Sequence, residues 1–141
     1  MYNDALEDEL INPPELIDRL TELGLEAVSL IDNEFQLAYS IRTQHLKLSA
    51  YDAIALAIAM NRHIDLATGD RRLRKVAESK GVKVIGSIGI VDMLYEKGII
   101  SPQEALSCLS MFKKINHTSV IRMPDDILQD RIEQLLQAIN N

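Results

Sequence analysis

Two aspartates, Asp52 and Asp70, are the residues of this chain whose type and spacing point to chemistry. Asp52 lies in the first turn of a predicted helix, and Asp70 follows the short apolar run "IDLAT" (64–68), which predicts a buried strand. A helix that precedes a parallel strand is expected to run antiparallel to it, so its start lies beside the end of that strand. Sites of such sheets form at this edge, and two carboxylates that meet there suit Mg²⁺ or Mn²⁺.

Helix capping is the competing explanation for both aspartates. With Ser49 as N-cap, Asp52 occupies the third helical position of an S-x-x-D capping motif, and Asp70 by itself is an ordinary N-cap. The segment that Asp52 opens, "AIALAIAM" (53–60), has no polar face and must be buried nearly all round. A carboxylate beside such a surface needs a cation, hydrogen-bond donors or a raised pKa. Both interpretations, caps and metal ligands, therefore stay open.

The run "RRLRK" immediately after Asp70 carries four positive charges, from Arg71, Arg72, Arg74 and Lys75. The ordinary explanation for such a run is a solvated helix face. Positive charge in the first turns opposes the helix dipole, however, so these residues are not placed to stabilise the helix. The chain has a net charge of −6, which disfavours nucleic-acid binding through overall charge. A local basic surface beside a metal cleft would suit a phosphate backbone.

The composition is that of one folded domain spanning residues 1–141, with 47% hydrophobic and 26% charged residues. The continuous apolar run 54–60 is far shorter than the roughly 20 residues needed to cross a bilayer, and we find no signal-peptide pattern. Cys108 is the only cysteine, which excludes an internal disulfide and fits a reducing compartment. We therefore expect a cytoplasmic protein without membrane partners.

Helix and strand signals alternate along the chain. The pattern predicts helices over 3–12, 14–23, 32–45, 49–62, 71–80, 88–97, 101–115 and 124–139, and strands over 25–31, 64–68 and 82–87. Helix ends are expected before Gly24, Gly81 and Gly98, an N-cap at Asp32, and a capping box at Ser101. Strands that alternate with helices of about ten residues imply crossover connections. The expected fold class is therefore α/β with a parallel sheet.

The segment 49–101 resembles the second half of bacterial PIN-domain proteins. It contains the helix-opening aspartate, a strand ending in "TGD", the strand "VKVIG" and a helix ending in "KGIIS". The most specific element is the pairing of "YDAIALA" with "LATGD". The resemblance covers most of the chain. It implies a three-layer α/β/α fold with a short parallel sheet, and a metal-dependent nuclease that usually acts on RNA, often as the toxin of a toxin–antitoxin pair.

The resemblance also implies roles for single residues. By position, Asp52 and Asp70 match two acids of the family's acidic site, and Thr68 matches the small hydroxyl residue before the last acid. A further acid is expected in the helix before "PPELIDRL", where Glu9 is our choice and Glu7 the alternative.

One feature of the family is not found in this sequence. PIN domains begin with an apolar strand that ends in an aspartate, and nothing upstream of Glu9 resembles it. We therefore expect a PIN-like chain that is truncated relative to the family and lacks the first strand and one acid. The absent strand would lie between 25–31 and 64–68, and an open slot there favours self-association into a homo-oligomer.

The leading hypothesis is an endoribonuclease in which Asp52, Asp70 and Glu9 hold Mg²⁺ or Mn²⁺ and the basic run holds RNA. An antitoxin-like protein is a possible second partner. The alternative, favoured by the missing aspartate, is a catalytically inactive PIN-like module that binds RNA or a partner protein. A weaker alternative, a Mg²⁺-binding α/β signalling domain, would need a strand-end aspartate flanked by acids, which we do not find.

Overall fold

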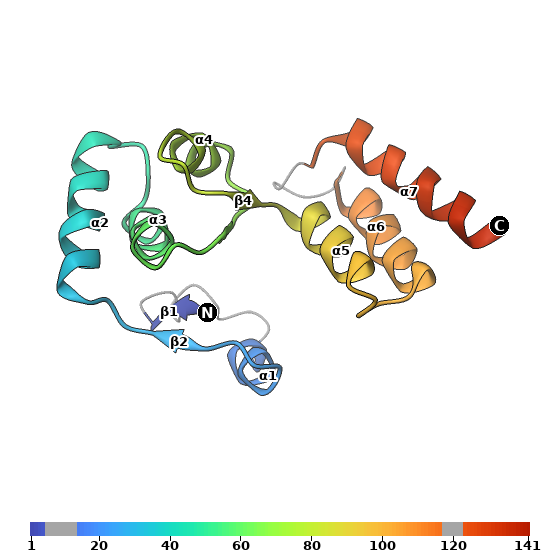
Figure 1. Ribbon diagram of the computed structural model, residues 1–141, viewed down its shortest axis with the longest axis horizontal. Coiled ribbons are helices and arrows are strands. Elements are labelled where there is room, and N and C mark those ends of the chain that lie inside the picture. Colours follow the sequence, from blue (N-terminus) through green and yellow to red (C-terminus); the bar gives the residue numbers. More distant parts are fainter. Residues whose placement is uncertain (5–13, 117–122) are drawn as a thin grey trace. The chain divides into compact units, whose positions relative to one another are not determined.

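The computed structural model describes residues 1–4, 14–116 and 123–141 (Figure 1). Helices and short strands follow one another in the order β1 (Tyr2–Asn3), α1 (Leu16–Glu22), β2 (Ala27–Val28), α2 (Asp32–Gln44), α3 (Ala50–Arg62), β3 (Leu66–Ala67), α4 (Arg71–Ser79), β4 (Val84–Ile85), α5 (Ser87–Glu96), α6 (Pro102–Asn116) and α7 (Asp125–Asn140). This is a mixed α/β protein, as predicted. No helix within these ranges is long and apolar enough to cross a membrane.

The strands form two parallel pairs, β1 with β2 and β3 with β4. In the first pair, Tyr2 lies opposite Ala27. In the second, the N–H of Leu66 donates to the carbonyl of Lys83, and the N–H of Thr68 donates to that of Ile85. Donors and acceptors both advance by two residues, which is a parallel register. The predicted parallel pairing is confirmed, but the three predicted strands are shorter than expected, with two residues each in β2, β3 and β4.

The N-terminal end differs from the prediction. A helix was expected to begin at Asn3, with no strand before Glu9, yet Asn3 lies in β1. The side chain of Asn3 is buried, and its Nδ2 donates to the carbonyl of Val28 at 2.9 Å. Pairing with β2 thus gives this buried amide a hydrogen-bond partner, which explains why Asn3 lies in a strand and not at the start of a helix. The expectation of only three strands is therefore wrong. The rest of the predicted helix falls on residues 5–13, outside the described residues.

Helix ends follow local signals in most places. Gly24, Gly81 and Gly98 have positive φ angles just past the ends of α1, α4 and α5, as predicted. At the start of α6, the N–H of Ser101 donates to a carboxylate oxygen of Glu104 at 2.7 Å, which confirms the capping box. The predicted N-cap at Asp32 is wrong, because α2 already begins at that residue.

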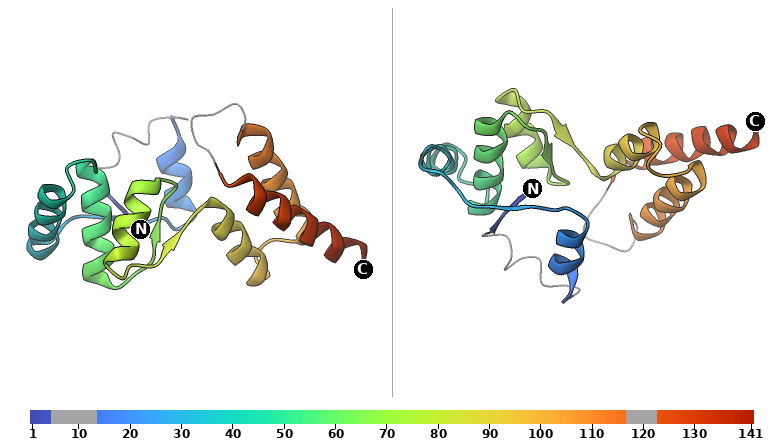
Figure 2. Two further views of the ribbon diagram at one scale, coloured as in Figure 1. Left: turned by 90° about the horizontal axis from the view of Figure 1, so that it is seen from above. Right: turned by 60° about the horizontal axis from the view of Figure 1, so that its bottom comes forward.

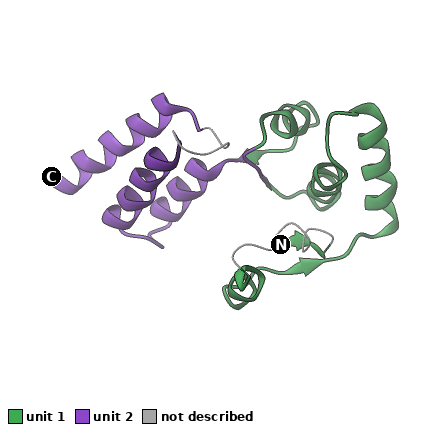
Figure 3. Ribbon diagram, turned by 180° about the vertical axis from the view of Figure 1, so that it is seen from behind, with its two compact units in different colours: residues 1–66, 70–84 green, residues 67–69, 85–141 purple. Residues whose placement is uncertain are grey.

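The structure divides into two compact units, shown in Figure 3: unit 1 comprises residues 1–66 and 70–84, and unit 2 comprises residues 67–69 and 85–141. Each unit has its own cluster of buried apolar side chains. Because two cores are present, the expected single domain over 1–141 stays a prediction.

Helix α3 forms the centre of the unit 1 core. It lies between α2 and α4, as Figure 2 shows, and contacts both. Leu56 and Ala57 have no exposed surface, and Leu73 of α4 packs into the same cluster. The prediction of a helix buried nearly all round is confirmed for its middle turns, while Asn61 near its end is exposed.

Unit 2 is built from α5, α6 and α7. The last two helices pack along each other, and α5 packs against α6. Leu109 and Leu128 are fully buried at the contact between α6 and α7. Asn116, the last residue of α6, donates from Nδ2 to the carbonyl of Met123 and accepts from the N–H of that residue at its Oδ1. It also donates to Oδ1 of Asp125, the first residue of α7, and so joins the two helices.

Candidate metal and nucleic-acid site

Asp52 lies in the first turn of α3 and forms a reciprocal cap with Ser49. The N–H of Asp52 donates to Ser49 Oγ at 3.0 Å, and the N–H of Ser49 donates to Asp52 Oδ2 at 3.0 Å. The capping interpretation of this residue is therefore confirmed. Within the described part of the chain, Oδ1 of Asp52 has no hydrogen-bond partner. One oxygen thus stabilises the helix, and the other is available to a ligand.

Asp70 is the N-cap of α4. Its Oδ1 accepts hydrogen bonds from the N–H groups of Arg72 and Leu73, both at 2.8 Å. It stands three residues after the end of β3, with Thr68 and Gly69 between them. The prediction of an N-cap that follows a parallel strand is confirmed.

The topology puts these two helix starts at one end of the helix pair. Helix α4 connects the parallel strands β3 and β4 and therefore runs antiparallel to both. Helix α3 reaches β3 through a tight reversal at His63, where φ is 53° and the N–H of Ile64 donates back to Ala59. It is therefore also antiparallel to β3. Since α3 contacts α4, Asp52 and Asp70 open two neighbouring helices that point the same way.

Two aspartates by themselves would suit only a cation that keeps most of its own water. Among the described residues, no three His, Cys, Asp or Glu side chains are grouped so that they could hold a metal ion. Two aspartates are sufficient for Mg²⁺, which proteins commonly hold through one or two carboxylates plus water and substrate phosphate. An all-protein cage does not fit these residues. The predicted third ligand, Glu9, and its alternative, Glu7, lie outside the described residues.

The basic run lies on α4, mostly on its exposed face. Arg71, Arg72 and Lys75 are exposed, on the side of the helix opposite the buried Leu73. Arg74 is partly buried and makes an ion pair with a glutamate of the same helix at 3.5 Å. Three of the four basic residues of the run are therefore accessible, and the role of the run and of Thr68 in RNA binding stays a prediction.

Asp4 is an acid at the end of a strand, and the sequence pattern did not predict it as a site residue. It follows β1, and its Oδ2 accepts a hydrogen bond from Ser29 Oγ at 2.7 Å. It does not complete the site, because Asp4, Asp52 and Asp70 are all described and do not form a ligand group of three. The signal that could have identified this residue is an acid directly after a short paired segment.

Glu34 is the most strongly perturbed carboxylate that the structure describes. It is fully buried, and it accepts hydrogen bonds from Arg62, from the Asn61 side chain and from the N–H of Ile31. The hydrogen bond from Arg62 is the main cause that lowers the pKa of Glu34 to about 2. A shifted pKa often marks a functional site, but here every described partner is structural, so we assign Glu34 to the stability of unit 1.

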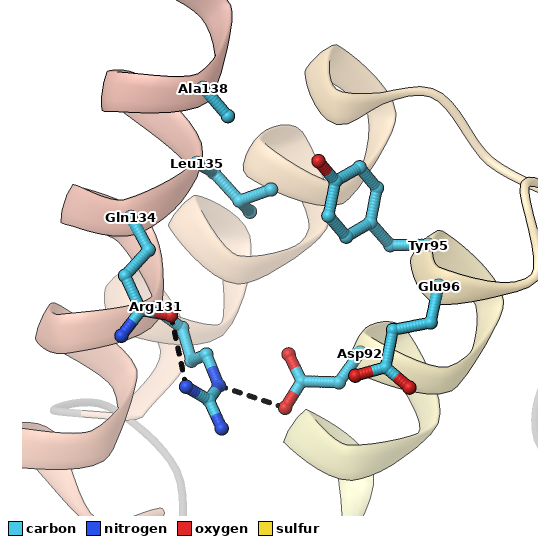
Figure 4. Close-up of a pocket in the computed structure, with 7 residues that line it drawn as sticks. All are labelled: Asp92, Tyr95, Glu96, Arg131, Gln134, Leu135 and Ala138. Carbon is cyan, nitrogen blue, oxygen red and sulfur yellow. Dashed lines mark hydrogen bonds and ion pairs between the residues drawn. The ribbon is translucent and has the colours of Figure 1, made fainter.

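Two cavities lie away from the predicted residues. A cavity of about 440 Å³ lies between the C-terminal end of α3 and the chain after α4, and its lining includes His63 and Lys83. It is at the opposite end of these helices from Asp52 and Asp70. A smaller cavity of about 180 Å³ lies between α5 and α7, where Asp92 accepts a hydrogen bond from Arg131 (Figure 4).

Comparison with known families places the chain beside one of them. A family model described as a PIN domain matches residues 6–137, which is nearly the whole chain. No curated protein and no solved structure matches the chain.

Proposed function

Since the chain belongs to the PIN-domain family, we propose that it is a divalent-metal-dependent endoribonuclease that hydrolyses RNA phosphodiester bonds. The family match over residues 6–137 is the observation that carries this proposal. It supports a nuclease-type module in general. We further propose that its substrate is RNA and that it acts as the toxin of a toxin–antitoxin pair.

We assign the metal-holding role to Asp52 and Asp70, with Glu9 or Glu7 as the third acid. Oδ1 of Asp52, which has no hydrogen-bond partner in the described part of the chain, supports this assignment. When bound, Mg²⁺ or Mn²⁺ would lower the pKa of a coordinated water and neutralise charge on the phosphate. Both aspartates stand at helix N-termini, where backbone N–H groups and the helix dipole favour an anionic phosphate.

The exposed basic face of α4 is assigned to the RNA backbone. Arg71 and Arg72 follow Asp70 in the chain, and Lys75 lies one turn further on the same exposed face. Phosphate contacts of this kind position a substrate without reading its sequence. Two further RNA contacts are proposed, Arg74 on the same helix and Thr68, which lies two residues before Asp70.

The alternative function is a catalytically inactive PIN-like module that binds RNA or an antitoxin-like protein. It is favoured by two observations on the described residues. No three potential ligands are grouped there, and both Asp52 and Asp70 already cap helices. In that case the two helix starts would serve folding rather than hydrolysis.

Cleavage of a labelled single-stranded RNA by metal-free protein, with and without added Mn²⁺, distinguishes these functions. The variants are Asp52→Asn and Asp70→Asn, because asparagine keeps an oxygen that can cap the helix but removes the charge that a metal needs. Asp126→Asn is the matched control, since Asp126 is an exposed aspartate in the first turn of α7. We expect Mn²⁺-dependent cleavage that both site variants abolish and the control retains. RNA binding without cleavage at any metal concentration would support the inactive module instead.

A further inference from the structure

We propose that the cavity between α5 and α7 binds a small organic ammonium ion, a primary amine with an apolar body of about four to six carbons. The cavity has a volume of about 180 Å³ and lies within unit 2 (Figure 4). Its lining combines charged side chains with an aromatic ring and an aliphatic wall: Asp92, Glu96, Arg131, Tyr95, Leu135 and Ala138. The inference does not depend on the proposed nuclease activity.

One ion pair spans this cavity from α5 to α7. Nε of Arg131 donates to Oδ2 of Asp92 at 2.9 Å, and a terminal nitrogen of Arg131 donates to the side chain of Gln134 on its own helix. The same guanidinium lies 3.9 Å from a carboxylate oxygen of Asp130. Its positive charge is therefore already shared by two carboxylates.

Glu96 is a further carboxylate at the cavity. Within the part of the chain that the structure describes, its side chain has no ion-pair or hydrogen-bond partner. It lies one turn after Asp92 on α5, where like charges repel each other. It is also the last residue of α5, where a negative charge opposes the helix dipole, and the last turn of this helix has no basic residue. Its charge is therefore not placed to stabilise the helix.

The charge balance of the cavity selects a cation as the ligand. Two carboxylates and one guanidinium line it, which leaves a net charge of −1. In Figure 4 the side chains of Asp92 and Glu96 extend from α5 on the side that faces Arg131. An ammonium group carries three hydrogen-bond donors, and Oδ1 of Asp92 and both carboxylate oxygens of Glu96 have no partner among the described residues. An ammonium ion between the two carboxylates would also remove their mutual repulsion.

The other walls of the cavity favour an organic cation over a metal ion. The Tyr95 ring attracts cations to its face, and Leu135 and Ala138 add apolar surface that a hydrated metal ion cannot use. A cavity of about 150 Å³ holds a benzene molecule, so this cavity accommodates a ligand of about six to eight non-hydrogen atoms. An alkylammonium ion with a short chain has this size and this combination of a charged head and an apolar body.

Titration of the full chain with three small ligands, followed by two-dimensional ¹H–¹⁵N NMR at constant ionic strength, tests the cavity. n-Pentylammonium is the probe, methylammonium has the charge without the apolar body, and pentanoate has the body with the opposite charge. We expect n-pentylammonium to shift the signals of α5 and α7 with a millimolar dissociation constant, and methylammonium to bind about tenfold or more weakly. Pentanoate should produce no shift there. No shift with n-pentylammonium, or equal binding of either control ligand, would overturn the proposal.

The variant Glu96→Gln tests the assigned carboxylate. Glu22→Gln is the matched control, because Glu22 is also an exposed glutamate at the last position of a helix, but it belongs to α1 in unit 1. We expect the dissociation constant of n-pentylammonium to rise about fivefold or more in Glu96→Gln and to stay within about twofold in the control. Since Glu96 does not stabilise α5, Glu96→Gln should melt no lower than the natural chain, which separates lost binding from lost folding. Equal effects of the two variants would contradict the assignment.

Discussion

Glu34 and Arg62 form a two-point ion pair that joins the start of α2 to the end of α3. Arg62 donates from Nε to one carboxylate oxygen of Glu34 at 2.6 Å and from a terminal nitrogen to the other at 2.9 Å. A third hydrogen bond from Arg62 reaches the carbonyl of Ser29, which follows β2. Because the Glu34 side chain has no exposed surface, this pair holds β2, α2 and α3 together from inside unit 1.

Breaking this pair should destabilise the protein strongly. Arg62→Ala leaves a buried carboxylate without its cation, and we expect a loss of about 3–5 kcal/mol in the free energy of unfolding, measured by urea denaturation. Glu34→Gln, which removes the charge but keeps the shape, should cost less. Arg42→Ala is the control, because the described partner of that partly buried arginine is a backbone carbonyl. Equal losses for Arg62→Ala and Arg42→Ala would contradict the assigned role.

The same pair predicts a loss of stability in acid. The pKa of Glu34 is lowered from 4.5 to about 2 in the folded protein, chiefly by the hydrogen bond from Arg62. A lowered carboxyl pKa contributes stability that is complete above pH 4.5 and is lost as the pH falls towards 2. Urea unfolding at a series of pH values should show this slope in the natural chain and a smaller slope in Glu34→Gln. Identical slopes would contradict it.

The two substitutions of Asp70 should separate capping from chemistry. Asp70→Ala removes the acceptor for Arg72 and Leu73 and should cost about 1 kcal/mol of stability, whereas Asp70→Asn should cost only a few tenths. Both substitutions should abolish Mn²⁺-dependent cleavage. If Asp70→Asn remains fully active, Asp70 is a structural cap and not a ligand.

Mn²⁺ should raise the melting temperature of the natural chain, because a ligand that binds only the folded state stabilises it. The increment should disappear in Asp52→Asn and Asp70→Asn and remain in the control variant Asp126→Asn. Differential scanning calorimetry with EDTA-treated protein measures it without any RNA. An increment that survives in Asp70→Asn would place the metal elsewhere.

Replacing Arg71, Arg72 and Lys75 with alanine should weaken RNA binding and lower its salt dependence. Each lost phosphate contact removes about 0.7 from the slope of log K against log salt on single-stranded RNA. Lys97 and Lys114 are exposed lysines of unit 2, and their replacement by alanine provides the control. Fluorescence anisotropy over a series of salt concentrations measures both effects. An unchanged slope would mean that the basic run does not contact RNA and is an ordinary solvated helix face.

The sequence by itself determined the features that depend on a few neighbouring residues. Ser49 with Asp52, Ser101 with Glu104, and Asp70 were each recognisable as helix starts, because a capping side chain and its backbone partner lie within three residues of each other. The segment 53–60 is apolar on every face of a helix, which likewise indicated the buried helix of unit 1.

Only the tertiary structure decided the contacts between distant segments. The partner of Glu34 is 28 residues away, and the pairing of Asn3 with β2 joins residues 25 apart, so no local pattern encodes either. The acidic composition after Asn3 predicted that a helix begins at this residue, but Asn3 itself lies in β1, because its buried side chain must find a partner and donates to Val28. The division into two cores also depends on which apolar faces meet. The hydrophobic effect is non-directional, so the sequence pattern shows which faces are buried but not which face packs against which.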